Sequence, residues 1–234
     1  MFNAAEGINT DRYGRQLILP GWGVAAQREL ASKKALLVGA GGLGSPILLY
    51  LSSAGIGTLG IIDGDTVDLS NLHRQVVHNE ANCGQNKAFS ARQKCLQLNS
   101  EACIEAYPYH LTAVNAPLLV PLYDVLIDAS DNAETRRGLR YARRDRSRSW
   151  NYWDATIFAV FSCFKNTFHI LSIFFSPVLF PTAKALEVLK ICGGLTETVL
   201  SRRMLLFDGA DPFQPWRTIK LREKIPSCAG ITVF

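Results

Sequence analysis

The residues best suited to chemistry lie in a glycine-rich stretch. Gly39, Gly41 and Gly44 follow an apolar run with G-x-G-x-x-G spacing, and Gly42 adds a fourth glycine. Glycines permit a tight turn and let a phosphate approach the backbone amides at a helix N-terminus. A second apolar segment ends at Asp63, 19 residues after Gly44, close to the ~20-residue interval expected for a ribose-binding acid. The pattern favours nucleotide binding over a glycine turn used only for packing a helix on a sheet.

Further polar residues follow the predicted strands. The stretch 64–75 is acidic first and ends in Arg74-Gln75, and Asp131-Asn132 follow a later apolar segment. The carboxyl ends of parallel strands open a ligand crevice, where an acid and an amide can hold a metal, a ribose or a phosphate. Asp131 and Asn132 could equally cap the next helix. Lys87, in the first turn of a predicted helix, either meets a bound phosphate or is solvated, because the helix dipole disfavours a cation there.

The elements that must position these residues alternate between apolar strands and amphipathic helices. This alternation predicts an α/β fold with a doubly wound, mostly parallel sheet. A chain of 234 residues with 48% hydrophobic content is large enough for one sizeable domain. Strands are expected at 36–38, 58–62, 102–107 and 123–129; helical segments are expected at 11–17, 45–51, 85–98 and 115–122, with a further turn at 27–32.

Composition narrows the class of protein. The net charge is +5, and much of the excess comes from arginines between positions 136 and 148. Such a cluster is more often a solvated helix face than a nucleic-acid site, so no nucleic-acid partner is predicted. The six cysteines include no C-x-x-C pair, and residues 1–30 carry charges throughout without a long apolar core. We therefore expect a reducing, cytoplasmic location rather than a disulfide framework.

Several motifs together resemble the ThiF/MoeB family of adenylating enzymes related to ubiquitin-activating enzymes, particularly the eukaryotic molybdopterin-synthase sulfurylases. The resemblance covers residues 12 to about 136 and resumes at 185–191 and 205–208. The matching pieces are R-Y-G-R-Q at 12–16, G-A-G-G-L-G at 39–44, I-D-G-D-T-V at 62–67, S-N-L-H-R-Q at 70–75, G-Q-N-K-A at 84–88 and S-D-N at 130–132.

The resemblance implies an ATP-dependent reaction in which the C-terminal glycine of a ubiquitin-like sulfur carrier ending in Gly-Gly is adenylated, as in molybdopterin synthesis or tRNA thiolation. Catalytic roles would fall to Arg15, Arg74, Lys87 and Asp131. The implied nucleotide contacts are Gly39, Gly41, Gly42, Gly44, Asp63, Ser70, Asn71, Leu72, His73, Arg74, Lys87, Asp131 and Asn132. Asp63 would hold the ribose and Asp131 would hold Mg²⁺. Arg15 would reach the partner's site in a homodimer.

One segment, 137–184, matches nothing in the family and is predicted to be a non-family insert within the single domain 1–234. Seven of the twelve phenylalanines fall within 158–180, and no glycine occurs from 139 to 192. Lys165 and Lys184 bracket 18 uncharged residues, near the ~20 that cross a bilayer. Polar residues dilute this run, so buried strands or an exposed patch are expected instead of a membrane span.

The structural zinc of the family is expected to be missing. Such a site needs four thiolates in two close pairs. Cys228 has Ile231 at its C-x-x-C partner position, and Cys163 and Cys192 are unpaired. Cys163 lies in the non-matching segment, and it is interpreted as a buried free thiol.

Three functions remain open on the sequence. The first is the adenylation implied by the resemblance. The second is a catalytically silent variant that retains nucleotide or carrier binding. The third is an NAD-type oxidoreductase on the same glycine loop, which Arg74, Lys87 and Asp131 argue against because a dinucleotide redox site does not need them.

Overall fold

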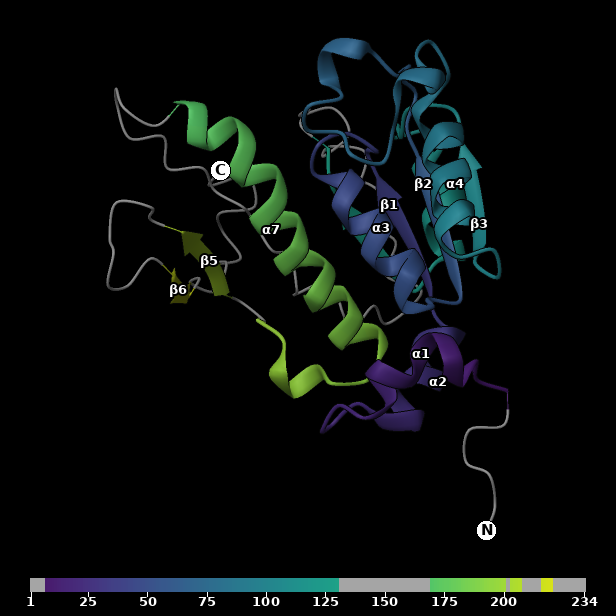
Figure 1. Cartoon of the computed structure of the whole chain (residues 1–234), viewed down its shortest axis with the longest axis vertical. Coiled ribbons are helices and arrows are strands. Elements are labelled where there is room, and N and C mark those ends of the chain that lie inside the picture. The colour runs from purple at the N-terminus through teal and green to yellow at the C-terminus, as the bar shows by residue number, and fades with distance from the viewer. Residues whose placement is uncertain (1–6, 131–168, 201–202, 208–215, 221–234) are drawn as a thin grey trace.

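A four-stranded parallel sheet forms the centre of the protein (Figure 1). The computed structural model describes residues 7–130, 169–200, 203–207 and 216–220. The strand order is β3-β2-β1-β4, and all three pairings are parallel. The strands are β1 (Lys34–Val38), β2 (Thr58–Ile62), β3 (Cys103–Tyr107) and β4 (Val125–Asp128). Placing the first strand centrally, with parallel neighbours on both sides, confirms the predicted doubly wound α/β fold.

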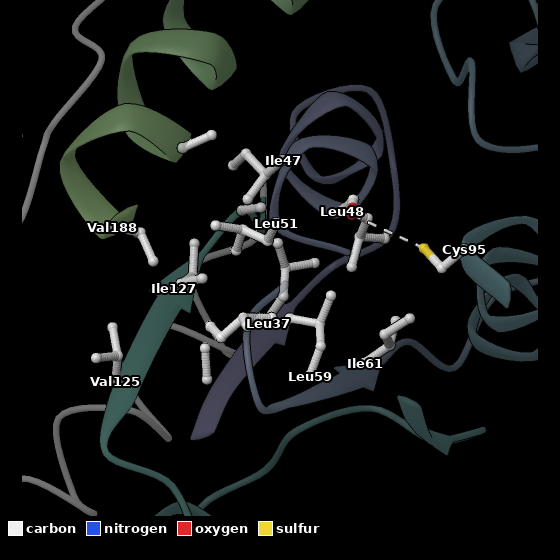
Figure 2. Packing of buried hydrophobic residues seen from close by; sticks show 14 of the residues in the cluster. Leu37, Ile47, Leu48, Leu51, Leu59, Ile61, Cys95, Val125, Ile127 and Val188 are labelled. Atoms are coloured by element: carbon white, nitrogen blue, oxygen red, sulfur yellow. Dashed lines mark hydrogen bonds between the residues drawn. The ribbon is translucent and has the colours of Figure 1, made fainter. Parts of the chain in front are cut away.

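Three helices cover one face of this sheet: α3 (Gly44–Ala54), α4 (Lys87–Leu98) and α7 (His169–Cys192). Helix α7 lies beside α3 (Figure 1). Every second strand residue faces these helices, and residues such as Leu37, Leu59 and Ile127 pack with helix residues in one apolar cluster (Figure 2). Val188 joins this cluster from α7. Fully buried aliphatic side chains of this kind stabilise a fold by about 1.5–3 kcal/mol each.

The opposite face of the sheet carries a smaller apolar cluster. Leu36 and Val38 of β1 and Ile62 of β2 point to this face, because successive strand residues alternate. They pack against α5 (Ala116–Leu119) and the 3-10 turn η3 (Val120–Leu122). Both faces of the sheet are therefore covered, as a parallel sheet requires.

Two N-terminal helices, α1 (Thr10–Leu17) and α2 (Gly23–Ser32), pack at the end of α3 and α4 that is remote from the glycine loop (Figure 1). The Asn99 side-chain amide donates to the Tyr13 hydroxyl at 3.2 Å. Gln16 and Gln27 both donate to the Ala54 carbonyl, at 3.2 and 2.9 Å. The two glutamine bonds satisfy the Ala54 carbonyl at the C-terminus of α3, which the helix itself leaves unpaired.

The remaining described elements are short. They are the 3-10 turns η1 (Leu69–Asn71), η2 (Glu80–Asn82) and η4 (Thr196–Thr198), and the antiparallel strands β5 (Arg203–Phe207) and β6 (Trp216–Lys220). The arginine cluster, Cys163 and Cys228 lie outside the described residues.

Most predicted elements are present, and one expectation was wrong. The turn expected at 27–32 is helical and belongs to the longer helix α2. The apolar run after 165 was expected to form strands, but its described part is helical, within α7. A continuous apolar run does not distinguish strand from helix by periodicity, and this run exceeds ordinary strand length. In the part of the chain described here, no helix combines the length and apolar character needed to cross a membrane.

Candidate functional site

The loop between β1 and α3 needs glycine at two positions for backbone reasons. Gly39 has a φ of +96°, and a Cβ added there would lie 2.9 Å from the Ala129 carbonyl oxygen. A Cβ on Gly44 would lie 1.9 Å from the carbonyl oxygen of Gly39. A side chain at Gly39 would push the loop away from Ala129, and a side chain at Gly44 would push the helix start away from Gly39. Gly39 and Gly44 therefore fix the tight turn that the spacing predicted.

The two middle glycines are not explained by crowding. A Cβ on Gly41 would come no closer than 3.6 Å to Gln75, and one on Gly42 no closer than 3.4 Å to Arg74. Both are ordinary contact distances. Within the described residues the N–H groups of Gly41 and Gly42 meet no hydrogen-bond acceptor. Two neighbouring amide donors without acceptors at a helix N-terminus are the arrangement that binds phosphate.

Asp63 lies next to this loop at the end of β2 and is 8% exposed. Its Oδ2 accepts from the Ala40 N–H at 2.7 Å, and its Oδ1 accepts from the Asp65 N–H at 2.9 Å. A carboxylate offers about four lone-pair sites, so these two bonds leave acceptor capacity. Asp63 thus holds the glycine loop in place and can still accept bonds from a ligand hydroxyl.

Lys87 begins α4 and is buried, so the alternative of a solvated lysine was wrong. Its Nζ donates to Asp65 Oδ2 at 2.8 Å. Asn86 caps the helix by accepting from the backbone N–H groups of Ala88 and Phe89. It also donates to the Asp63 and Asp65 carbonyls, which ties α4 to the loop after β2. Because Asn86 is the cap, α4 starts at Lys87, two residues later than predicted.

The S-N-L-H-R-Q stretch forms a compact turn over the glycine loop. The Arg74 guanidinium donates to Asn71 Oδ1 at 2.7 Å and lies 3.1 Å from His73 Nε2. The Ser70 N–H donates to Asp68 at 2.7 Å, and the Leu72 N–H donates to the Leu69 carbonyl, so both belong to the turn itself. The turn therefore holds the Arg74 side chain directly beside Gly42.

Two predicted groups are not part of this cluster in the described chain. Arg15 is exposed on α1, at the far end of α3, and makes no hydrogen bond or ion pair within the described residues. Asp131 and Asn132 lie outside the described residues, although Ala129, the residue after β4, lies against Gly39. The structure thus brings together the glycines, Asp63, Asn71, His73, Arg74 and Lys87, with Ser70 and Leu72 in the supporting turn.

Sequence reasoning missed two buried polar residues at this site. Gln75 is 4% exposed beside Gly41, and its Oε1 has no hydrogen-bond partner in the described part of the chain. His78 is 7% exposed; its Nε2 lies 2.9 Å from the Ala40 carbonyl oxygen and its Nδ1 lies 2.8 Å from Ser90 Oγ. Gln75 ended a recognised motif and could have been found there. The spacing of the four histidines gave no signal for His78.

The contacts of His78 define its protonation. The Ala40 carbonyl can only accept, so Nε2 carries the proton, and the neutral ring accepts the Ser90 hydroxyl proton at Nδ1. Burial is the main cause that lowers the His78 pKa; nearby Lys87 lowers it further, while the Ala40 bond and Asp63 oppose the shift. His78 is therefore held as a neutral imidazole in the folded protein.

We expect the buried, neutral His78 to make the stability of the protein depend on pH below the ordinary histidine pKa of about 6.5. The folded-state pKa is depressed, so the stabilising contribution is complete above pH 6.5 and is lost as pH falls through the folded-state pKa. The free energy of unfolding from urea titrations should fall more steeply between pH 7.5 and 5 in the wild type than in His78→Gln. Parallel pH profiles for the two proteins would contradict a buried neutral His78.

The described residues also include four cysteines, whose thiols could in principle react. Cys83, Cys95, Cys103 and Cys192 are free thiols. Burial raises the pKa of Cys95 to about 11 and that of Cys192 to about 12, so these two stay protonated and unreactive at neutral pH. Across the described ranges, no group of three or more His, Cys, Asp or Glu residues could hold a metal ion.

A parallel sheet of order 3-2-1-4 with a glycine loop after its first strand defines a Rossmann-like α/β protein. Residues 13–148 match the ThiF family, more than half of the chain, and the chain belongs to that family. The adenylyltransferase and sulfurtransferase MOCS3 of Dictyostelium discoideum is 39% identical over 93% of this chain and 56% of that protein. The chain spans about half the length of the curated relatives it matches.

Solved structures agree with the fold. The E. coli tRNA N6-threonylcarbamoyladenosine dehydratase TcdA in complex with ATP is 30% identical and superposes with a TM-score of 0.54, covering 58% of this chain and 56% of that chain. E. coli MccB with AMPCPP and MccA reaches a TM-score of 0.71 over 94% of this chain and 74% of that chain, at 18% identity. At that identity the second likeness establishes the fold alone.

Proposed function

We propose that this chain binds ATP and adenylates the C-terminal glycine carboxylate of a ubiquitin-like sulfur carrier. One observation carries the proposal: the Gly41 and Gly42 amides meet no acceptor among the described residues, and the Arg74 side chain lies beside Gly42. Two neighbouring amide donors and a cation can together bind a phosphate. The TcdA structure in complex with ATP and the relative named adenylyltransferase and sulfurtransferase support a nucleotide as the occupant.

The residues fit a nucleotide laid along the carboxyl ends of the strands. Asp63 has acceptor capacity for the ribose hydroxyls. Asn71, Arg74 and Lys87 would contact the triphosphate, and Gly39, Gly41, Gly42, Gly44, Ser70, Leu72 and His73 line the loop and turn around it. Asp131, with Asn132 beside it, would hold magnesium, which when bound neutralises phosphate charge as a Lewis acid.

The proposed chemistry needs no nucleophile from the protein. The carrier's carboxylate attacks the α-phosphorus of ATP, an acyl–phosphate bond forms, and pyrophosphate leaves with the electrons of the broken P–O bond. Both partners are anions, so the enzyme must offset their repulsion and the charge that develops on pyrophosphate. Arg74 and Lys87 are cations near the loop that can do so, and their fixed positions remove the cost of reorienting solvent.

The rest of the assignment rests on the family resemblance of the motifs and is part of the proposal. We assign the chain to a cytoplasmic homodimer in which Arg15 enters the partner's site, and we treat 1–234 as one adenylation domain with a divergent segment at 137–184. Sulfur transfer, in molybdopterin synthesis or tRNA thiolation, would follow adenylation. It is assigned from the name of a relative of which this chain spans about half.

Carrier-dependent exchange of labelled pyrophosphate into ATP tests this function. We expect exchange with carriers that end in Gly-Gly, because exchange requires reversible formation of the acyl-adenylate. Carriers truncated by those two glycines are the matched control and should support none. ATP binding by calorimetry without any exchange would identify the chain as a silent variant. The absence of both would remove the proposed function altogether.

A further inference from the structure

Three successive peptide units of the glycine loop are each held by a separate partner. The Ala40 N–H is bound by Asp63, the Ala40 carbonyl by His78, and the Gly41 carbonyl by the Ser45 amide at 2.9 Å and the Ser45 hydroxyl at 2.7 Å. In a trans peptide the carbonyl and the N–H point in opposite directions. The bond from His78 therefore fixes the Gly41 N–H on the side away from the imidazole, and Ser45 does the same for the Gly42 N–H.

His78 is also joined to the helix that carries Lys87. Its Nδ1 accepts from Ser90, which lies three residues after Lys87 and so on the same side of α4. The imidazole thus connects the amide donors of the loop with the helix that presents the lysine. Its burial keeps water from competing for either bond.

From this geometry we infer that His78 is a positioning residue for phosphate binding, which acts by holding the Ala40–Gly41 peptide so that the Gly41 N–H faces the nucleotide. The inference rests on the proposed function, because it takes a nucleotide phosphate as the ligand of the loop. His78 does not touch the nucleotide itself. Preoriented donors bind an anion without a reorganisation cost, which is the advantage that loss of the His78 bond would remove.

Four variants separate the two bonds of His78. His78→Gln retains a donor at the Nε2 position and can still bind the Ala40 carbonyl. His78→Met introduces a side chain as long as glutamine that has no hydrogen-bond donor. His78→Asn keeps a polar group only at the Nδ1 position, near Ser90, and Ser90→Ala removes the other partner while leaving the Ala40 bond.

The measurements are calorimetric dissociation constants for MgATP and for adenosine, with thermal melting of each variant. We expect His78→Gln and Ser90→Ala to bind MgATP within about threefold of the wild type. We expect His78→Met and His78→Asn to bind it about tenfold or more weakly, because a misoriented Gly41 N–H would lose its hydrogen bond to the charged phosphate. Adenosine, which has no phosphate, should bind all five proteins equally.

Several outcomes would overturn the inference. Equal MgATP affinities in all four variants would remove any role in phosphate binding, and equal losses for adenosine and MgATP would assign His78 to the general shape of the site. A His78→Met protein that fails to fold beside a folded His78→Gln would assign the bond to stability. A wild-type protein that does not bind MgATP would reject the proposed function as well, whereas normal wild-type exchange with unaffected variants would reject only the role of His78.

Discussion

Replacing Asp63 with alanine is expected to weaken ATP binding more than tenfold. The carboxylate has two uses: it holds the Ala40 and Asp65 amides, and its remaining lone pairs can accept ribose hydroxyl bonds. Hydrogen bonds to a charged acceptor stabilise by about 1.5–3 kcal/mol, which corresponds to roughly 10- to 150-fold in a dissociation constant. Calorimetry with MgATP gives the loss directly, and Glu80→Ala, an exposed acid in the following loop, is a control for the change in charge.

Deoxynucleotides separate the two uses of Asp63. If the carboxylate binds the ribose, 2′-deoxy-ATP or 3′-deoxy-ATP should bind the wild type more weakly than ATP does, and that difference should disappear in Asp63→Ala. This double cycle isolates the pairwise interaction between the carboxylate and the hydroxyl. Should ATP and both deoxy forms lose the same factor in the variant, Asp63 would act only by orienting the glycine loop.

Local patterns in the sequence were enough to predict the framework of the site. The positive φ of Gly39 and the contact of Gly44 with the Gly39 carbonyl are local to one turn, and Asp63 follows a strand whose apolar run is plain in the sequence. The parallel character of the sheet also follows from the alternation of strands and helices. Features that depend on neighbouring residues in the chain were therefore predictable.

Contacts between distant segments were not predictable in the same way. Lys87 pairs with Asp65 across 22 residues, and His78 binds Ala40 across 38 residues. Neither contact leaves a periodic signal, because each depends on how the loop after β2 folds back over β1. The helix α7 was missed for another reason: most positions of its first half are apolar, so the sequence gives no clear helical period there.

The residues of the R-Y-G-R-Q motif have two different structural roles. Tyr13 is buried beside Gly55 and bonded to Asn99, and Gln16 caps the end of α3. Arg12 donates to the Leu98 carbonyl at the end of α4. These three residues fix α1 on the domain, and Arg15 is left exposed without a partner in the described residues. An exposed arginine on a helix that is fixed to the domain is well placed to contact a second subunit.

We accordingly expect Arg15→Ala to reduce the rate of carrier adenylation roughly 10²–10³-fold, the usual effect of removing one charge-stabilising donor. The residue lies at the opposite end of α3 from the glycine loop, about 16 Å for eleven residues. It is therefore too far from its own site to act there. Pyrophosphate exchange measures the loss, and Lys34→Ala is the control for the change in charge, because Lys34 is an exposed cation at the start of β1, away from the glycine loop.

Mixing two inactive proteins tests whether Arg15 acts across a dimer. In a heterodimer of Arg15→Ala and Lys87→Ala chains, one site combines the intact Lys87 of the first chain with the intact Arg15 of the second. Random exchange of subunits makes about half of the dimers mixed, with one working site of two, so activity should return to about a quarter of wild type. Light scattering would establish the dimer, and a mixture that stays inactive after proven subunit exchange would show that Arg15 does not complete its partner's site.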